Sequence, residues 1–274
     1  MKGMKVFING EFTDEGRAFI SPFSPGFMYG YGVFETIKVC RGRAVFLKEH
    51  YDRLMKGLDF LNIQADLDLQ GFCDICEKLM RENVVEDGFL KIMSFKGRGG
   101  SADIIIYTGK KVYVDEYERG FGICLADSRR NEYSKLCTVK SMNYAENIIQ
   151  KERAAGLGFE EAIFLNTRGD ICEGCISNIF WVKEGRMYTP SINCGILPGI
   201  AREKVIELCA AEGIEIMEGG FGIEDMEGAD EIFITNSLMD IMPVNRFEDR
   251  TFSICDMEFT NSLIDMYRRK YYAD

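Results

Sequence analysis

Histidine is almost absent from this chain, whose 274 residues include only His50. A Ser-His-Asp or Cys-His catalytic centre would therefore have to depend on this one side chain. His50 falls in a predicted helix and has the charged neighbours Lys48, Glu49 and Asp52. The sequence thus gives no support to catalysis by a serine or cysteine that a histidine activates.

Positive charge and long apolar runs are also scarce. Lys and Arg number 33 against 44 Asp and Glu, which gives a net charge of -11 at pH 7. Proteins that bind nucleic acid need a concentrated basic surface, so no nucleic-acid partner is expected. No apolar run approaches the roughly 20 residues of a membrane-spanning helix, and the start "MKGMKVFINGEF" has no apolar signal-peptide core. We expect a soluble cytoplasmic protein with no membrane partner.

Cysteine is plentiful, with ten residues. In a chain of this length without a secretion signal, free thiols are a better interpretation than a disulfide scaffold. Two C-x-x-C spacings occur, Cys73/Cys76 and Cys172/Cys175. The first pair lies on a predicted helix with apolar neighbours, which favours burial as small hydrophobic side chains. Since the two pairs are far apart and only one histidine is present, no metal site is predicted.

Length and composition are those of a globular protein, with 46% hydrophobic and 12% aromatic residues. We predict an α/β (α+β) fold with two domains, residues 1–119 and 120–274, divided after the polar stretch Asp115–Arg119. Apolar periodicity predicts helices at 48–61, 69–81, 144–155, 200–212 and 256–271. It predicts strands at 5–8, 33–39, 43–47, 89–95, 103–108, 112–114, 121–126, 136–139, 161–165, 179–182, 186–189, 214–218, 231–235 and 241–245.

The most informative stretch is Ile163–Arg202. Glu173-Gly174 leads into the predicted strand Ile179–Val182, and Leu197-Pro198-Gly199 then opens a helix. The backbone N–H groups of such a helix start, with the helix dipole behind them, suit a phosphate. A carboxylate for a ring nitrogen and a helix start for a phosphate could together hold both ends of pyridoxal phosphate.

With this segment, the chain resembles the class-IV (fold type IV) pyridoxal-phosphate enzymes. These include branched-chain and D-amino-acid aminotransferases and 4-amino-4-deoxychorismate lyases. Further matching segments, in the family's order, are "FINGEF", "SPFSPGFMYGYGVFETIKV", "FLKEHYDRL", "VKSMNYAENIIQKE" and "DEIFITNSLMDIMPV". The resemblance covers nearly the whole chain. It implies pyridoxal 5′-phosphate as cofactor, a homodimer, a smaller N-terminal α/β domain on the substrate side, and a larger barrel-like C-terminal domain.

The resemblance also implies catalytic roles for three residues. Lys140, in the pattern K-S-x-N-Y, would link covalently to the cofactor and then move protons as the general base. Glu173 would pair with the ring nitrogen and keep it protonated, so that the ring stabilises a carbanion. Tyr144 would contact the ring 3-oxygen.

The remaining cofactor contacts follow from the same resemblance. Phosphate binding is implied for the Arg53 guanidinium, the backbone N–H groups of Ile200 and Ala201, and the Ser237 hydroxyl. Many relatives have threonine where this chain has Ala201, so one hydroxyl contact would be missing. The ring faces would be packed by Ile176 and Leu197.

The choice of substrate is less clearly marked. Phe34 stands where D-amino-acid aminotransferases have tyrosine, and their arginine-x-histidine carboxylate trap has no counterpart here. The loop from Lys96 through Arg98 to Ser101 partly follows the lyases' R-G-x-G-G-R-G, which implies that Lys96 and Arg98 bind substrate carboxylates. The resemblance therefore favours the lyase slightly over an aminotransferase acting on branched-chain or D-amino acids with a keto acid.

Overall fold

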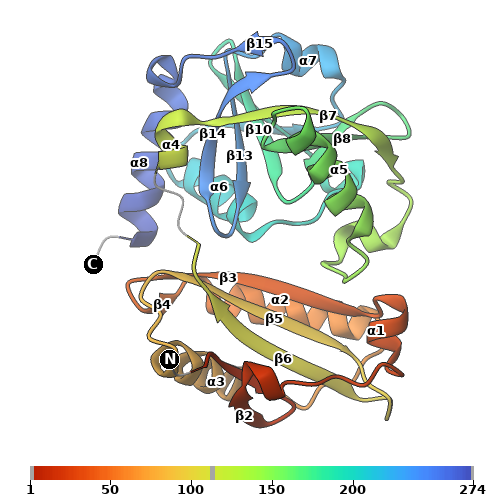
Figure 1. The fold of residues 1–274 in the computed structure, drawn as a ribbon. Helices are drawn as coiled ribbons and strands as arrows, with labels where there is room; N and C mark the ends of the chain where they lie inside the picture. Colours follow the sequence, from red (N-terminus) through yellow and green to blue (C-terminus); the bar gives the residue numbers. More distant parts are fainter. Residues whose placement is uncertain (1–2, 112–114, 273–274) are drawn as a thin grey trace. The chain divides into compact units, whose positions relative to one another are not determined.

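The computed structural model describes residues 3–111 and 115–272, and its chain divides into two compact units (Figure 1). The first consists of Met1–Val112 and Val139–Tyr144, and the second of Tyr113–Thr138 and Ala145–Asp274. The predicted domain division after residue 119 stays a prediction. It assigned Lys140 to the C-terminal domain, whereas these units place Lys140 with the N-terminal part of the chain.

The first unit is built on a six-stranded antiparallel sheet in the order β2-β1-β6-β5-β3-β4. Its strands are β1 Lys5–Ile8, β2 Glu11–Asp14, β3 Gly32–Cys40, β4 Arg43–Ala44, β5 Gly88–Lys96 and β6 Ala102–Gly109. The long ladder between β3 and β5 places Phe34 opposite Met93 and Thr36 opposite Lys91. This register decides which side chains of the two strands are neighbours.

Helices α2 (Leu47–Phe60) and α3 (Leu69–Glu82) pack against this sheet, together with the short α1 (Pro25–Tyr29). A 3-10 helix, Glu15–Arg17, follows β2. Side chains alternate along a strand. Ile37 of β3 and Leu90 and Ile92 of β5 are therefore in the core with the helices. Thr36, which precedes Ile37, and Lys91, which lies between Leu90 and Ile92, belong to the opposite face of the sheet, where Phe34 also lies.

The second unit contains a mixed nine-stranded sheet in the order β12-β11-β10-β13-β14-β7-β8-β9, with β15 paired to β14. Its strands are β7 Phe121–Arg130, β8 Glu161–Asn166, β9 Ile171–Gly174, β10 Asn178–Lys183, β11 Arg186–Pro190, β12 Ile216–Gly219, β13 Glu231–Asn236, β14 Asp240–Phe247 and β15 Arg250–Thr251. The sheet curls on itself, because β9 at one end also contacts β10 and β11 near the other. This is the barrel-like form expected for this part of the chain.

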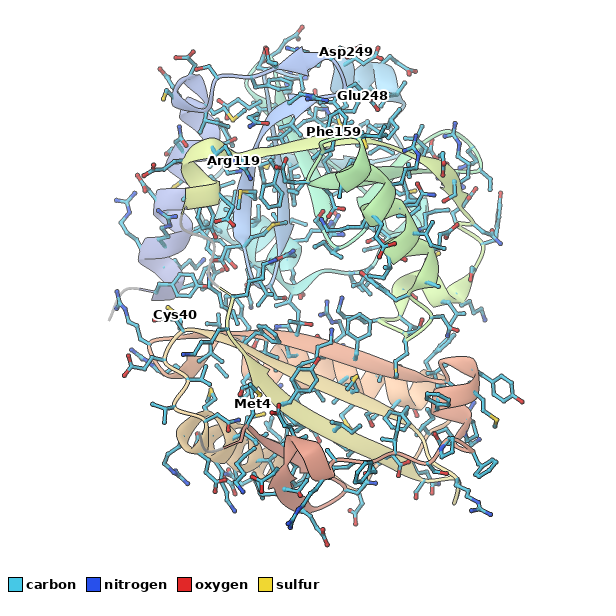
Figure 2. The ribbon with its side chains drawn as sticks, in the orientation of Figure 1. Met4, Cys40, Arg119, Phe159, Glu248 and Asp249 are labelled. Carbon is cyan, nitrogen blue, oxygen red and sulfur yellow. The ribbon has the colours of Figure 1, made fainter. Side chains whose placement is uncertain are left out.

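The strand β8 is buried on both faces, which explains its continuous apolar run. Ile163 joins a core with Trp181 and Ile234 on one side of the sheet. Phe164 joins a second cluster on the other side, with Phe159. The Arg246 guanidinium lies 3.8 Å from the ring centroid of Phe159, which is labelled in Figure 2.

The helices of the second unit are α4 Asp115–Arg119, α5 Ala145–Gly156, α6 Ile200–Ala211, α7 Ile223–Glu227 and α8 Glu258–Tyr272. Three 3-10 helices lie at Lys135–Thr138, Ile192–Cys194 and Ile254–Asp256. No helix within residues 3–111 and 115–272 is both long and apolar enough to cross a membrane.

Most predicted elements are confirmed, but two assignments differ from the structure and a third is not tested. The predicted strand 136–139 is wrong, since Lys135–Thr138 form a 3-10 helix. The predicted strand 43–47 ends after Ala44, because Phe46 has φ 54 and α2 begins at Leu47. The predicted strand 112–114 lies outside the described residues. The sequence analysis missed the short β2, β9, β15, α1, α4 and α7.

Candidate active site

Lys140 is placed by backbone pairing with β3. The Phe34 N–H donates to the Lys140 carbonyl at 3.0 Å, and the Met142 N–H donates to the Gly32 carbonyl at 2.8 Å. The Lys140 Nζ consequently lies 4.6 Å from the centroid of the Phe34 ring and 5.6 Å from that of Tyr144. The Phe34 and Tyr144 rings meet edge to face at 5.1 Å. The structure thus brings together three of the predicted site residues.

A second amine, which the sequence analysis missed, lies on the same face. The Lys91 Nζ donates to the Thr36 Oγ1 at 3.0 Å and lies 4.0 Å from the Phe34 ring centroid. Burial lowers the pKa of Lys91 to about 8, against the opposing effect of the Glu35 charge. Strand alternation gave a usable signal, since the neighbours Leu90 and Ile92 are core residues. Lys91 therefore belongs to the face that carries Phe34.

Arg53 on α2 is fixed by a buried carboxylate. Its Nε and Nη2 donate to the two carboxylate oxygens of Glu35 at 2.8 and 2.7 Å, and the His50 Nδ1 is 2.7 Å from Glu35 Oε2. Burial raises the pKa of Glu35, but the charge and hydrogen bonds of Arg53, aided by His50, outweigh it and hold this pKa below its ordinary value. Glu35 is therefore ionised at neutral pH and orients the guanidinium.

His50 has a structural setting. Burial lowers its pKa, Glu35 opposes this shift, and the charges of Arg53 and Lys140 add to it. Its Nε2 has no hydrogen-bond partner within the part of the chain that the structure describes. A buried imidazole whose Nδ1 is taken by a carboxylate fits the positioning of Glu35 rather than the activation of a nucleophile.

In the second unit, Glu173 on β9 is buried and surrounded by donors. The Leu197 N–H donates to its Oε2 at 2.9 Å, and the Asn178 Nδ2 lies 3.5 Å from the same oxygen. The Arg130 Nη2 is 3.5 Å from Oε1, with its guanidinium 4.1 Å from the Phe164 ring centroid. A buried carboxylate that N–H donors approach on both oxygens has the chemistry to pair with a protonated ring nitrogen.

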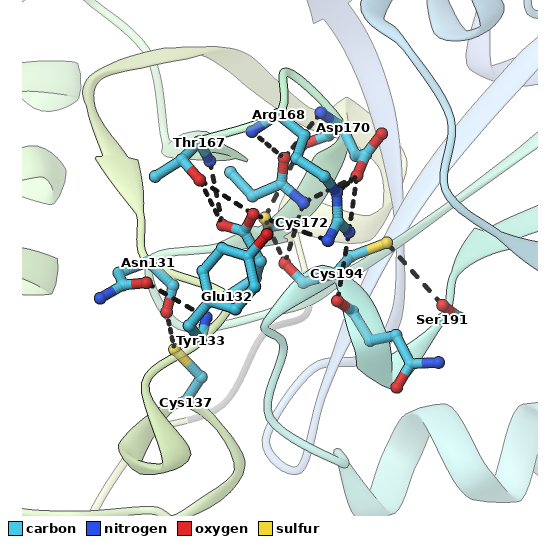
Figure 3. Close-up of polar contacts among 12 residues, drawn as sticks. Asn131, Glu132, Tyr133, Cys137, Thr167, Arg168, Asp170, Cys172, Ser191 and Cys194 are labelled. Carbon is cyan, nitrogen blue, oxygen red and sulfur yellow. Dashed lines mark hydrogen bonds and ion pairs between the residues drawn. The ribbon is translucent and has the colours of Figure 1, made fainter.

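The turn before β9 is braced by a polar network (Figure 3). The Thr167 N–H and hydroxyl both donate to the Glu132 carboxylate, at 2.9 to 3.1 Å. The Arg168 Nε donates to Asp170 Oδ2 at 2.9 Å. The Cys172 thiol donates to the Cys194 carbonyl at 3.0 Å. These bonds fix the strand that presents Glu173.

The start of α6 has the geometry of an anion site. Gly199 is its N-cap, and the first helical bond runs from the Glu203 N–H to the Gly199 carbonyl. The N–H groups of Ile200 and Ala201 precede that bond, so they have no acceptor within the helix. Both residues are buried. A Cβ at Gly199 would lie 1.9 Å from Asn178 Oδ1, so only glycine fits here.

Ile176 and the turn that contains Ser237 are joined through Asn236. The Asn236 Nδ2 donates to the Ile176 carbonyl at 3.3 Å. The Asn236 Oδ1 accepts from the N–H groups of Leu238 and Met239 at 2.9 Å. Ile176 lies between β9 and β10, so the hairpin that carries Glu173 is tied to the Ser237 turn.

Lys96 and Arg98 are not brought to the Phe34 face within the described residues. Lys96 lies on the other face of the sheet, with its Nζ 5.4 Å from the centroid of Tyr31, a ring whose hydroxyl donates to the Leu61 carbonyl. Arg98 is exposed in the β5–β6 loop, 5.8 Å from the centroid of Phe23. Their predicted substrate contacts stay predictions.

Six of the ten cysteines are buried, three are partly buried and Cys255 is exposed. All ten are free, and Cys76 lies in the core of the first unit, as the sequence predicted. Burial raises the pKa of Cys172, and it raises that of Cys175 to about 12. Across residues 3–111 and 115–272, no group of three His, Cys, Asp or Glu side chains is arranged to hold a metal ion.

Comparison with known proteins gives consistent matches over nearly the whole chain. The family model described as amino-transferase class IV matches residues 32–247. The aminodeoxychorismate lyase of Bacillus subtilis is 29% identical, over 97% of this chain and 94% of the relative. A putative branched-chain-amino-acid aminotransferase of Methanocaldococcus jannaschii is 34% identical, over 90% of this chain and 89% of the relative.

The fold is shared with solved structures. The crystal structure of the branched-chain amino acid aminotransferase of Escherichia coli aligns with a TM-score of 0.92 and 24% identity, covering 98% of this chain and 95% of that one. The predicted fold class is thereby confirmed.

Proposed function

The chain belongs to the amino-transferase class IV family, and we propose that within this family it is a 4-amino-4-deoxychorismate lyase of folate biosynthesis. Enzymes of the family depend on pyridoxal 5′-phosphate. The protein is therefore a pyridoxal-phosphate enzyme, either a lyase or an aminotransferase. The proposed reaction releases pyruvate from aminodeoxychorismate and leaves p-aminobenzoate.

The observation that favours the lyase is the pair of amines against the Phe34 ring. Lys91 is partly buried, and its Nζ donates a hydrogen bond to the neutral Thr36 hydroxyl and lies against the Phe34 ring. A buried cation is costly unless an anion pairs with it. Aminodeoxychorismate carries two carboxylates, one of which would supply this anion. Among the amino substrates of the two candidates, D-alanine and L-leucine instead have one carboxylate each and place an apolar side chain beyond it.

The residues present fit the cofactor. Glu173 is a buried carboxylate held by N–H donors, which suits a protonated ring nitrogen, and the α6 start with Gly199 suits a phosphate. Glu35 orients the Arg53 guanidinium through Nε and Nη2, and we propose that this guanidinium contacts the phosphate. Ser237 would add a hydroxyl there. Lys140 would hold the cofactor covalently, and Tyr144 would contact the ring 3-oxygen.

The bound cofactor supplies an electron-withdrawing ring, which stabilises negative charge on the attached substrate carbon. In the proposed reaction, Lys140 then removes the proton from substrate C4. The enolpyruvyl group leaves as pyruvate, and the six-membered ring becomes aromatic. Glu173 keeps the ring nitrogen protonated throughout, while Ile176 and Leu197 would pack against the ring faces.

The second candidate is an aminotransferase acting on branched-chain or D-amino acids. The putative branched-chain aminotransferase from Methanocaldococcus jannaschii, at 34% identity, supports it. In that reaction Lys140 would pass the proton from the substrate Cα to the cofactor, and a keto acid would have to accept the amino group. The requirement for a keto acid separates the two candidates.

We also propose a homodimer in the cytoplasm. The segment 19–29 exposes six large apolar side chains, among them Phe19, Phe23, Phe27 and Tyr29, which are 80%, 66%, 62% and 69% accessible. Monomeric proteins rarely expose contiguous apolar surface of this kind, which supports a second copy of the chain as its cover. The ten free thiols support a reducing compartment.

The deciding experiment gives the enzyme aminodeoxychorismate without a keto acid and follows pyruvate and p-aminobenzoate. Separate reactions receive D-alanine or L-leucine with 2-oxoglutarate, and Lys140→Ala serves as the inactive control. We expect catalytic release of pyruvate in the first reaction only. Fast transamination without pyruvate release would refute the lyase assignment and favour the second candidate.

A further inference from the structure

Asn178, the first residue of β10, bonds to both segments that would hold the cofactor. Its side chain is buried, with 5% of the residue accessible. The Asn178 Nδ2 donates to the Leu197 carbonyl at 3.0 Å and lies 3.5 Å from Glu173 Oε2. The Leu197 N–H donates to that same carboxylate oxygen at 2.9 Å. These three residues form a closed set of hydrogen bonds.

The other atom of the Asn178 amide faces the helix start. Its Oδ1 lies 1.9 Å from where a Cβ of Gly199 would be, and its Cγ lies 3.2 Å from that point. Gly199 has φ -73 and ψ 135, which any residue adopts. The need for glycine here therefore comes from the Asn178 side chain and not from the backbone.

We propose that Asn178 is a positioning residue that fixes the spacing between Glu173 and the start of α6. This inference rests on the proposed function, in which Glu173 takes the ring nitrogen of pyridoxal phosphate and the α6 start takes its phosphate. A ligand held at two ends gains from the second contact only when the spacing of the two sites matches its own length. Asn178 bridges the two segments and sets that spacing.

The test compares two ligands that differ only in the phosphate. Full-length protein stripped of cofactor is titrated with pyridoxal 5′-phosphate and, separately, with pyridoxal, and binding is followed by absorbance. The Kd for pyridoxal divided by the Kd for pyridoxal 5′-phosphate, called the phosphate ratio below, measures how much affinity the phosphate adds. We expect Asn178→Ala to lower this ratio about tenfold while changing the Kd for pyridoxal less than about threefold. Asn193→Ala, an exposed asparagine between β11 and α6, should change neither value.

Gly199 provides a matched second variant. Gly199→Ala should displace the Asn178 amide, so it should lower both the Tm and the phosphate ratio. In the double variant Asn178→Ala/Gly199→Ala both close atoms of the Asn178 amide are gone, and the Arg202 Cβ at 3.5 Å makes an ordinary contact. The Tm should then return to that of Asn178→Ala, while the phosphate ratio stays low. A Tm that recovers while the phosphate ratio stays low separates a positioning role of Asn178 from a role in packing alone.

Should Asn178→Ala fail to fold, Asn178→Asp keeps the shape and sets an acceptor against the Leu197 carbonyl and Glu173. It should lower the phosphate ratio at least as much. An unchanged ratio in the folded variants, or an equal loss for both ligands, would overturn the positioning role and leave the proposed function intact. If the unaltered protein bound no pyridoxal 5′-phosphate, both proposals would fail.

Discussion

The Glu173 carboxylate is held in place by a main-chain N–H and two side chains, so its position does not depend on a ligand. We expect Glu173→Gln to retain cofactor but to lower kcat at least about a hundredfold, because one preorganised charge contact contributes about 2.7–4 kcal/mol. Steady-state kinetics, with cofactor content checked by absorbance, measure this. Glu152→Gln on the exposed side of α5 is the control. A kcat equal to that of the unaltered enzyme would show that Glu173 does not pair with the ring nitrogen.

Lys91 should make substrate binding dependent on pH. Burial lowers its pKa to about 8, so the charged amine dominates below that pH and is lost above it. We expect the KM for aminodeoxychorismate to rise as the pH passes about 8, because the carboxylate loses its cation. Lys91→Gln should raise the KM about tenfold at neutral pH and flatten this rise. Lys91→Arg should keep a low KM at alkaline pH, since arginine stays charged.

Kinetics across this pH range test the assignment, with Lys110→Gln, on an exposed lysine, as the control. If Lys91→Gln and the unaltered enzyme share one pH profile, Lys91 does not bind the substrate. Borohydride reduction followed by peptide mapping adds a separate check. The cofactor should be found on Lys140 in both proteins, because Lys91 has no part in the covalent link.

Short sequence patterns identified individual candidate residues, but they did not identify the residues that lie beside them in the structure. Lys140 and Glu173 stand in short sequence patterns, whereas Lys91 is an ordinary strand lysine until its register partner Thr36 is known. That pairing joins residues 55 positions apart, and no local pattern encodes it. The same limit affected Lys96, since its place on the helix-covered face follows from counting alternation from the core residue Ile92.

At the scale of elements, long periodic segments were predictable and short ones were not. The helices α2, α3 and α6 and the strands β5 and β13 have repeated apolar positions that identify them. Residues 136–139 contain a similar apolar alternation but form a 3-10 helix followed by a single bridge at Ser141. Too few residues pair there for a strand, because the chain only touches the end of β3 before it enters α5.

The junction of β3 with α2 depends on one carboxylate. Glu35 binds Arg53 and His50, and its native pKa lies below the ordinary value. Its contribution to stability is therefore complete above the ordinary carboxyl pKa and is lost as the pH falls through the native one. We expect Glu35→Gln to lower the free energy of unfolding by about 3 kcal/mol at neutral pH, since it leaves a charged partner unpaired.

Urea denaturation at neutral and acidic pH measures this effect. The difference between Glu35→Gln and the unaltered protein should persist at neutral pH and shrink in acid. Glu77→Gln, on an exposed position of α3, should show no difference at either pH. Equal stability of Glu35→Gln and the unaltered protein at neutral pH would mean that the helix does not need this ion pair.

At the scale of the whole molecule, a second copy is the occupant that we propose for the exposed segment 19–29. We expect light scattering at micromolar concentration to give twice the 31.2 kDa mass of one chain. Phe27→Glu should raise the dimer dissociation constant at least about thirtyfold, because a charge replaces an apolar anchor in the interface. The side chain of Phe27 is 62% accessible, so this change removes little from the core of the unit.

Phe60→Glu is the matched control, since Phe60 is also exposed, at 42%, but lies at the end of α2 outside the segment. It should leave the mass and the activity unchanged. The resemblance to the class-IV enzymes implies an active site that the second copy completes. Loss of the dimer should therefore also lower kcat/KM. A fully active monomer would refute both the interface and that requirement, whereas an inactive monomer with retained cofactor would locate the missing contribution in the partner.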